Sequence, residues 1–517
     1  MSTLREKLAG SLEELRVLQD KGVAAIKSSD LSRANRERLL KNGFIKEVTK
    51  GWYIAVAPDE KPGDTTSWYS SYWSFCAQYL TVRFKQSYYL SPEHSLSIHS
   101  GNRTVPHQLI VRAVKGSNGI VRLLSGTTLF IIKSSLPKSA QITIKEGLRI
   151  LSPASSLIHC STTVFNNNPT DVRAVLSLIK DSSEVLSLLL EGGHSKKAGL
   201  LAGAFRNINQ NRMADEIGKT MQSAGYSIRE VDPFINASPI AISIKEKSPY
   251  ANRIKLLWHQ MREDVIKHFP KAPGLPKDHK KYMKLVEEIY VTDAYHSLSI
   301  EKYKVSPNLI ERVRSGNWNS KKNDADKDER NAMAARGYWQ ATQKVRLSIE
   351  KILKGRNPGI VADSDHGDWY RELFAPSVAA GIIKASDLAG YRNTQVYIGG
   401  SMHVPLHAEA VHDAMPVLFE LLENETEASV RAVLGHFIFV YIHPYTDGNG
   451  RMGRFLMNAM LASGGYPWTV IPVEERKAYM SSLEKASVGQ DIKPFAKLLG
   501  YLAEQTLKGK PVAKIKG

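Results

Sequence analysis

The chain of 517 residues is 42% hydrophobic and 23% charged, which predicts a globular protein of about three domains with ample apolar core. Its two cysteines, Cys76 and Cys160, are too few for a disulfide framework or a cysteine-rich zinc site. The start MSTLREKLAGSLEEL is charged, and no run of about 18 apolar residues follows. We therefore expect neither a secretory signal nor a membrane span, and a cytoplasmic protein.

The net charge of +19 is unevenly distributed and predicts an acidic partner. Residues 1–150 hold 22 Lys and Arg against 12 Asp and Glu, a surplus of +10. A small anionic ligand would account for a basic pocket, but not for a basic N-terminal third. Double-stranded DNA is the partner that this charge favours.

Residues 1–57 are expected to form three short helices followed by a hairpin. Leucines at helical spacing mark the first helix: Leu4, Leu8, Leu12 and Leu15. The segment GVAAIKSS predicts a short second helix, and Asp30 can cap a third, LSRANRERLLKN, which ends at Gly43. FIKEVTKGWYIAV predicts a two-stranded wing that turns at Lys50-Gly51. This order resembles a winged helix-turn-helix, and LLKNGFIKEVTKGWYI is similar to antitoxin regulators of the AbiEi type.

The resemblance implies that this module binds DNA. In that geometry Ser32, Arg33 and Arg36 lie on the helix that enters a major groove, while Lys46 and Lys50 on the wing meet phosphates. The alternative is a winged helix used only for protein contacts. The sequence carries no base-reading code from which an operator could be named.

Residues 65–240 predict an α+β and helical region without a visible catalytic set. SYYLSPEHSLSIHSG indicates a strand and then a helix, and three short strands follow in QLIVRAV, GIVRLLS and TTLFIIKS. Helical patterns begin at about residue 170. The region loosely resembles the effector half of AbiEi-type proteins. Three histidines lie close in sequence without cysteines or spaced carboxylates, and we interpret them as structural.

Residues 241–284 are expected to link this region to a C-terminal domain. Their end, FPKAPGLPKDHKKYMK, is rich in Pro and Lys. Further on, NSKKNDADKDERN at 319–331 mixes both signs of charge without an apolar period and predicts a solvated loop. Residues 506–517 are taken as a basic tail.

The most informative segment is His443–Arg454, HPYTDGNGRMGR, which lies between two predicted helices. Apolar residues recur at helical spacing before it and again after it, until a pair of glycines. Gly448, Asn449 and Gly450 therefore stand at the N-terminus of the second helix. Exposed N–H groups and the helix dipole attract anions there, and glycine lets a ligand approach the backbone closely.

The other polar residues of this segment suit the chemistry of bound phosphates. Arg451 and Arg454 lie on one side of the helix's first turn, where two phosphates could be held. Asp447 offers an oxygen ligand for Mg²⁺. His443 can take a proton from a hydroxyl as a neutral imidazole. The alternative is a buried core histidine with solvated arginines, which leaves GNGR at a helix start unexplained.

The segment resembles the signature of the Fic (Fido) family, HxFx(D/E)GNGRxxR. The match departs only at Tyr445, where Phe is usual, and we expect the ring to stay buried. The resemblance implies an all-α Fic domain over 285–505 that transfers AMP from ATP to a protein hydroxyl, with Mg²⁺ as cofactor. The protein substrate could be the chain itself.

The resemblance also implies a role for each residue of the signature. His443 is the general base, and Asp447 carries the metal. Asn449 and the loop amides, with Gly448 and Gly450, hold the α- and β-phosphates. Arg451 holds the β-phosphate, and Arg454 holds the γ-phosphate.

A second part of the Fic pattern lies upstream, in LAGYRNTQVYIGG at 388–400. It is similar to the family's β-hairpin flap, which holds a target segment by adding a strand to it. We expect Val396 and Ile398 on one strand face, Gln395 and Tyr397 beside them, and a tight turn at Gly399-Gly400. The alternative is an ordinary surface hairpin.

A third part, AYHSLSIEKYKVS, places Ser297 and Glu301 as in the family's inhibitory motif, (S/T)xxxE(G/N). The spacing alone occurs by accident, but its position at the start of the catalytic region supports the assignment. Lys302 replaces the expected Gly or Asn, so we expect incomplete inhibition. After the signature, Tyr479 resembles the family's adenine-side helix, with a core tyrosine as the alternative.

The sequence therefore predicts a multidomain protein: a winged helix-turn-helix, an α+β middle region and an all-α Fic domain with a β-hairpin flap. The predicted function is a protein adenylyltransferase, autoinhibited by the SxxxE helix and regulated by DNA binding. One rival is transfer of another phosphate-containing group; Gly450 argues against the phosphate-transferring branch, which typically has Lys there. The other rival is an antitoxin-like transcriptional regulator that only senses nucleotide, against which an intact His443 argues.

Overall fold

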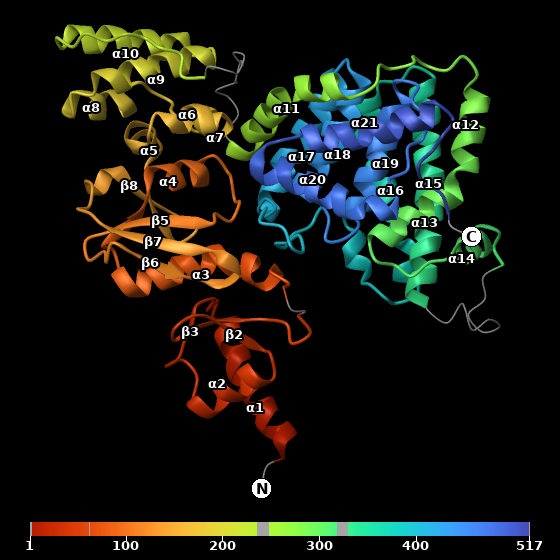
Figure 1. The fold of residues 1–517 in the computed structure, drawn as a ribbon, viewed down its shortest axis with the longest axis horizontal. Coiled ribbons are helices and arrows are strands. Elements are labelled where there is room, and N and C mark those ends of the chain that lie inside the picture. Colours follow the sequence, from red (N-terminus) through yellow and green to blue (C-terminus); the bar gives the residue numbers. More distant parts are fainter. Residues whose placement is uncertain (1–2, 61–62, 235–247, 318–328, 516–517) are drawn as a thin grey trace. The chain divides into compact units, whose positions relative to one another are not determined.

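The computed structural model describes residues 3–60, 63–234, 248–317 and 329–515 (Figure 1). The chain divides into two compact units. Unit 1 comprises Met1–Arg253 and Tyr397–Val404, and unit 2 comprises Ile254–Val396 and Pro405–Gly517. Most of the loop expected at 319–331 and the first residues of the expected linker lie outside the described residues. Among the described helices, none contains an apolar stretch of the length that a membrane span requires.

The N-terminal module of unit 1 contains two helices and a three-stranded antiparallel sheet of order β1-β3-β2. Its elements are α1 (Leu4–Asp20), β1 (Ile26–Lys27), α2 (Arg33–Lys41), β2 (Ile45–Thr49) and β3 (Trp52–Ala55). The hairpin expected to turn at Lys50-Gly51 is present, with Gly51 at φ 77°. Leu15, Ile26 and Leu39 belong to a small apolar core of this module.

Two expectations for this module were wrong. GVAAIKSS forms a turn and strand β1 instead of a helix, because Ile26 is buried and pairs with Tyr53 of β3. The helix α2 is capped by Ser32, whose hydroxyl accepts from the Asn35 N–H at 3.2 Å. Asp30, the expected cap, instead accepts from the Lys27 N–H at 2.8 Å.

The middle of unit 1 is built on a four-stranded sheet of order β4-β5-β7-β6, in which β5 and β7 run parallel. Its strands are β4 (Tyr88–Leu90), β5 (Gln108–Ala113), β6 (Gly119–Arg122) and β7 (Thr128–Lys133), with a separate hairpin of β8 (Ile142–Lys145) and β9 (Leu148–Leu151). The strand–helix pair and the three following strands expected from the sequence are confirmed. The helices of this region are α3 (Thr66–Phe84), α4 (Pro92–His99), α5 (Pro153–His159), α6 (Thr163–Asn167), α7 (Pro169–Leu176), α8 (Ser183–Glu191), α9 (Ser195–Asn207) and α10 (Asn211–Ser223).

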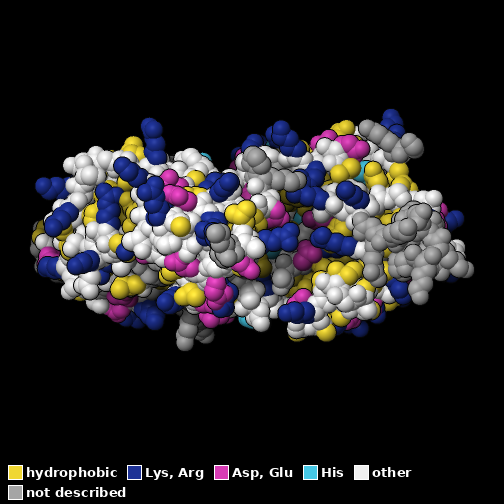
Figure 2. Space-filling model, turned by 90° about the horizontal axis from the view of Figure 1, so that it is seen from below, with side chains coloured by type: hydrophobic (Ala, Val, Ile, Leu, Met, Phe, Trp, Pro, Cys, Tyr) yellow, Lys and Arg dark blue, Asp and Glu magenta, His cyan; other side chains and the backbone are white. Residues whose placement is uncertain are grey.

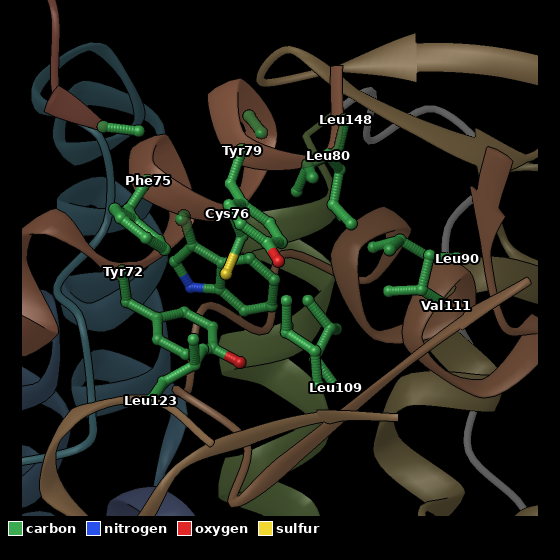
Figure 3. Packing of buried hydrophobic residues seen from close by; sticks show 14 of the residues in the cluster. Tyr72, Phe75, Cys76, Tyr79, Leu80, Leu90, Leu109, Val111, Leu123 and Leu148 are labelled. Carbon is green, nitrogen blue, oxygen red and sulfur yellow. The ribbon is translucent and has the colours of Figure 1, made fainter. Parts of the chain in front are cut away.

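Aromatic side chains of α3 form much of the core against this sheet (Figure 3). Phe75 and Tyr79 stack with ring centroids 5.8 Å apart, and Tyr72 is fully buried. Aliphatic side chains from the strands, such as Leu109 and Val111, complete the cluster. The sequence analysis missed α3 because its apolar residues occur on all sides, without the spacing of an amphipathic helix.

Unit 2 is helical among its described residues (Figure 1). Its helices are α11 (Pro249–His268, which begins in unit 1), α12 (His279–Glu288), α13 (Tyr290–Ile300), α14 (Pro307–Arg314), α15 (Glu329–Leu353), α16 (Pro358–Ala379), α17 (Ala408–Asn424), α18 (Ala428–Ile442), α19 (Asn449–Ala462), α20 (Arg476–Gly489) and α21 (Lys493–Leu507). Nearly all residues of α18 and α19 are buried. The expected basic tail begins inside α21, and Ala513 beyond it is buried.

The expected flap has its turn but no β-strands. Gly400 has φ 78°, and the Ser401 N–H donates to the Ile398 carbonyl at 3.1 Å. No residue from 388 to 407 has strand structure. The arms are held by other contacts: the Val105 N–H of unit 1 donates to the Met402 carbonyl at 2.9 Å. Backbone groups bound in this way are not available for a cross-strand ladder.

Candidate active site

The segment between α18 and α19 is a tight loop with left-handed backbone at both ends. His443 follows α18 with φ 55° and ψ 61°, and Gly448 precedes α19 with φ 81° and ψ 2°. The Asn449 side chain closes the loop: its Oδ1 accepts from the Tyr445 N–H at 2.9 Å, and its Nδ2 donates to the Tyr445 carbonyl at 2.8 Å. The Tyr445 ring is buried, as expected, and stacks on the Tyr370 ring with the ring centroids 3.7 Å apart.

The Asn449 side chain shapes the loop that presents the N-terminus of α19, because both ends of its amide are bonded to the Tyr445 backbone. The bond to the Tyr445 carbonyl uses one of the two Nδ2 hydrogens. The expected contact of Asn449 with phosphates stays a prediction.

Two glycines leave room over the first turn of α19. A Cβ at Gly448 would lie 2.7 Å from the Phe374 ring, and the positive φ disfavours other residues in any case. A Cβ at Gly450 would lie 2.3 Å from Oε1 of Glu301. A carboxylate oxygen thus already lies against the helix N-terminus, where the sequence predicts bound phosphate.

His443 has the protonation state that a general base needs. Its Nδ1 lies 3.0 Å from the Val440 carbonyl. A carbonyl only accepts, so Nδ1 carries the proton and Nε2 presents a lone pair. Burial lowers the pKa of His443 to about 4, against the opposing effect of the Val440 bond. The imidazole is therefore neutral at pH 7.

Asp447 is the residue of the loop whose carboxylate could hold a cation. Its side chain is 68% exposed at the mouth of the loop. One oxygen accepts from the Gly448 N–H at 2.6 Å, and the other lies 3.2 Å from Nη2 of Arg451. No group of three or more His, Cys, Asp or Glu in the described part of the chain could hold a metal alone. A single carboxylate fits Mg²⁺, which takes its other ligands from phosphates and water.

The two arginines of α19 are buried and held differently. The Arg451 guanidinium lies between the rings of Tyr303 and Phe374, 5.2 and 5.0 Å from their centroids. Arg454 is 3% exposed, and its Nε donates to the Ser297 hydroxyl at 2.8 Å. Arg451 lies beside Asp447, and Nη1 of Arg454 would lie 3.3 Å from a Cβ at Gly450, so both guanidinium groups are near the start of α19. Their binding of phosphates stays a prediction.

Glu301 forms an ion pair with Arg454. Its Oε1 accepts from Nη2 of Arg454 at 2.7 Å, and the Ser297 carbonyl accepts from the same nitrogen at 3.0 Å. The helix α13 brings the two acceptors together because Ser297 and Glu301 are one turn apart. Burial would raise the pKa of Glu301, but the charges of Arg454 and Arg451 outweigh it and lower this pKa below its ordinary value. The carboxylate is ionised at neutral pH.

Lys302 occupies a position that favours glycine. It follows the C-cap residue Glu301 and has φ 67°. The Lys302 N–H donates to the Ser299 carbonyl at 3.0 Å, and the Tyr303 N–H donates to the Leu298 carbonyl at 3.1 Å. This bonding pattern is a Schellman motif with Lys302 at its left-handed residue, where a Cβ costs about 1 kcal/mol. The backbone that carries Glu301 is therefore mildly strained.

Arg392 is a residue of the site that the sequence analysis did not identify. It is 3% exposed, and its Nε donates to the His443 carbonyl at 2.7 Å. Its other nitrogens donate to the carbonyls of Thr394 and Leu406, at 2.9 and 2.5 Å. One guanidinium therefore joins both arms of the flap segment to the backbone of the candidate base. In the sequence, its only sign was an arginine within a segment that was expected to be a surface hairpin.

The remaining expected site residues are less central. Tyr479 is 1% exposed, and its hydroxyl lies 2.8 Å from Nε2 of His436. This placement favours the core alternative over an adenine-facing surface. Gln395 donates from Nε2 to the carbonyls of Val396 and Pro405, at 3.1 and 3.0 Å, and so braces the flap segment. Tyr397 is 38% exposed.

The expected DNA-contacting residues lie in unit 1. Arg33 pairs with Glu37 at 2.8 Å, and Lys46 lies 3.9 Å from Glu60. Arg36 is half-buried and donates to the Ser28 carbonyl. The exposed ones are Ser32, Arg33, Lys46 and Lys50. Lys and Arg side chains are spread over the face shown in Figure 2 and mixed with Asp and Glu, without one uninterrupted basic patch on that face.

Residues 367–461 match the sequence model of the Fic/DOC family, from α16 to the end of α19. The C-terminal region holds a Fic domain. Protein adenylyltransferase Fic of Nematostella vectensis is 24% identical to the chain over 425 residues, which cover 80% of this chain and 92% of that protein. The Drosophila grimshawi protein of the same name is 40% identical over 121 residues, only 23% of this chain and 24% of that protein.

Solved Fic structures are also similar to this chain. Fic-1 (residues 134–508) from Caenorhabditis elegans is 17% identical, with a TM-score of 0.38, and the match covers 66% of this chain and 87% of that one. A Fic-domain signaling protein from Bacteroides thetaiotaomicron is 18% identical, with a TM-score of 0.34 over 51% of this chain and 99% of that one.

The geometry of Lys302 leads to a stability prediction. Lys302→Gly should raise the free energy of unfolding by about 1 kcal/mol, because glycine adopts a positive φ without the steric cost of a Cβ. Urea denaturation followed by circular dichroism measures it. The matched control is Lys302→Ala, which removes the same charge but keeps the Cβ and should show no gain. An equal gain in both variants would contradict the strain argument and point to the lysine charge.

Proposed function

We propose that the Fic domain transfers AMP from ATP to a Ser, Thr or Tyr hydroxyl of a protein, including the chain itself. The observation that carries the proposal is the pairing of a neutral His443, whose Nε2 is the basic nitrogen, with an anion-binding helix N-terminus one loop away. The shared name of the relatives, protein adenylyltransferase Fic, supports the same activity.

In this proposal Nε2 of His443 accepts the proton of the target hydroxyl, whose oxygen attacks the α-phosphorus. A bond from the hydroxyl oxygen to phosphorus forms, and the bond from phosphorus to the bridging oxygen breaks. Pyrophosphate leaves, held by Arg451, Arg454 and the amides of the first turn of α19. Asp447 would hold Mg²⁺, which supplies charge neutralisation on the phosphates when bound.

We further propose that Glu301 inhibits this reaction. Its carboxylate lies against Gly450 and binds Arg454, so it takes the place and the cationic partner of a phosphate. ATP would then bind with its α-phosphate displaced from the line of attack. A displacement of about 1 Å can cost on the order of a hundredfold in rate. The strained backbone at Lys302 supports incomplete inhibition in the wild type.

The role of His443 is tested by His443→Ala. The rate of transfer should fall by about a hundredfold or more, because proton abstraction by a positioned base contributes about 10²–10⁴. The dissociation constant for ATP should change by no more than a few-fold, since the amides and arginines remain. Transfer is followed with radiolabelled ATP, and binding by isothermal titration calorimetry. Transfer at the wild-type rate would refute the mechanism, and joint loss of binding and transfer would assign His443 a structural role.

The inhibitory contact is tested by Glu301→Gly, which should raise self-modification about a hundredfold by releasing Arg454. Adding Arg454→Ala should cancel the gain, because the released arginine is the group through which the mutation acts. Glu311→Gly is the matched control, because Glu311 lies on α14 and its carboxylate pairs with Arg314 of the same helix. It should leave the rate unchanged. A Glu301→Gly protein no more active than wild type would show that the SxxxE spacing is accidental.

We also propose that the N-terminal module binds double-stranded DNA, as an antitoxin-like regulator would. The surplus of ten positive charges in residues 1–150 and the exposure of Arg33 and Lys50 support this. Reversing the charges of Arg33 and Arg36 in the full chain should abolish mobility shifts of genomic duplexes, and wild-type affinity should fall steeply with salt. Arg16→Glu, on the exposed face of α1, is the control for a charge reversal outside α2, and it changes half as much charge. No shift of any duplex at low salt would assign the module to protein contacts.

A further inference from the structure

A cavity of about 440 Å³ lies in the middle of unit 1, far along the chain from the Fic signature. It is bounded by β4, β5, the ends of α5 and α8, and the segment that follows β7. Small-molecule sites have volumes of about 300–1,000 Å³. The cavity is therefore large enough for a small organic ligand.

Arg112 of β5 contributes a guanidinium to this cavity. Arg112 is paired across the sheet with Tyr89 of β4, and both residues line the cavity from one face of the sheet. The Nε atom of Arg112 is buried and has no hydrogen-bond partner among residues 3–60, 63–234, 248–317 and 329–515. A buried cationic donor without a partner is costly, because it loses its hydration without compensation. Because this nitrogen is shielded from solvent, a ligand in the cavity would meet the outer nitrogens of the half-buried Arg112 side chain.

Other basic groups gather around the same cavity. His159 at the end of α5 and His194 before α9 both line it, with ring centroids 6.2 Å apart. Burial is the main cause of a lowered pKa of His159, followed by the charges of His194, Lys197 and Arg112. Glu191 also lines the cavity, but its carboxylate pairs with Lys138. Arg112 and Lys197 therefore make the local electrostatic environment positive, while His159 offers a hydrogen bond as a neutral imidazole.

The rest of the cavity wall is mixed. Leu136, Pro137 and Leu188 give it an apolar side, and Gln141 and Ser135 add neutral polar groups. A ligand that matches this wall has an apolar or aromatic body and a compact anionic end. A phosphate monoester carries a charge near −2 at pH 7 and can engage more than one cation at once.

We propose that this cavity binds a small phosphate monoester, with the phosphate on Arg112, His159 and His194 and the organic part against Leu136 and Leu188. The site is separate from the Fic nucleotide site and uses none of its residues. The middle region of the chain then binds a small ligand independently of the Fic domain.

The proposal is tested with phenyl phosphate as the probe and isothermal titration calorimetry of the full-length protein. Arg112→Gln should weaken binding about tenfold or more, the loss expected for a charge-assisted hydrogen bond at a desolvated site. Arg122→Gln is the matched control, since Arg122 is an exposed arginine on β6 of the same sheet and does not line the cavity. It should bind as the wild type does. The Fic loop is intact in both variants, so its own affinity for phosphate cancels in the comparison.

Two further measurements keep the test decisive. His159→Gln should weaken binding several-fold, and all three variants should unfold at the wild-type urea midpoint, which excludes misfolding as the cause. Benzoate, with a single negative charge, should bind at least tenfold more weakly than phenyl phosphate. Equal phenyl phosphate affinity in Arg112→Gln and Arg122→Gln would overturn the proposal. Benzoate binding as tight as phenyl phosphate binding, and lost in Arg112→Gln, would overturn the assignment to phosphate.

Discussion

The ion pair between Glu301 and Arg454 is the interaction on which the candidate active site depends. A carboxylate is held against the N-terminus of α19, and the arginine that could bind a phosphate is already bound by Glu301 and Ser297. Arg454 is nearly inaccessible, so removing one partner would leave the other charge unpaired or only partly hydrated. The contact is favourable only while no stronger anion competes for Arg454. The helix N-terminus and Arg454 are therefore the elements that an inhibitory carboxylate and a nucleotide would share.

The base and the flap are joined by a second set of contacts. Arg392 donates to the His443 carbonyl and to carbonyls on both arms of the flap segment. The tip of the flap segment belongs to unit 1, where Val404 joins the apolar core. A shift of this segment would therefore act on the backbone that fixes the position of the imidazole.

The sequence predicted the parts of the site that follow from local rules. The apolar spacing on either side of the signature predicted α18, α19 and the loop between them. The SxxxE spacing predicted the contact between Glu301 and Arg454. The predictions were wrong or incomplete where contacts between residues distant in sequence determine the local structure. Asn449 closes the loop onto Tyr445 through its side-chain amide, a structural role that the signature alone did not suggest. The flap has no strands because its backbone groups bind Arg392, Gln395 and unit 1.

Longer-range packing also explains the other differences. The second N-terminal helix is replaced by β1, because Ile26 is buried in the sheet that β3 provides. Helix α3 has no amphipathic period, because its own buried aromatic side chains lie on most sides of the helix. Arg392 could not be recognised from the sequence alone, because the carbonyls that it binds come together only in the folded structure. The same holds for Arg112, because the sequence does not show that its Nε has no hydrogen-bond partner among the described residues.

Retention of label from ATP distinguishes AMP transfer by the Fic loop from transfer of another phosphate-containing group. Wild-type protein and Glu301→Gly would each be incubated with Mg²⁺ and ATP labelled at either the α- or the γ-phosphate, and protein-bound label would be measured after denaturation. We expect label to be retained from the α position only, and more of it with Glu301→Gly. Retention from the γ position, or no retention from either position in both proteins, would contradict the assignment of this site to AMP transfer.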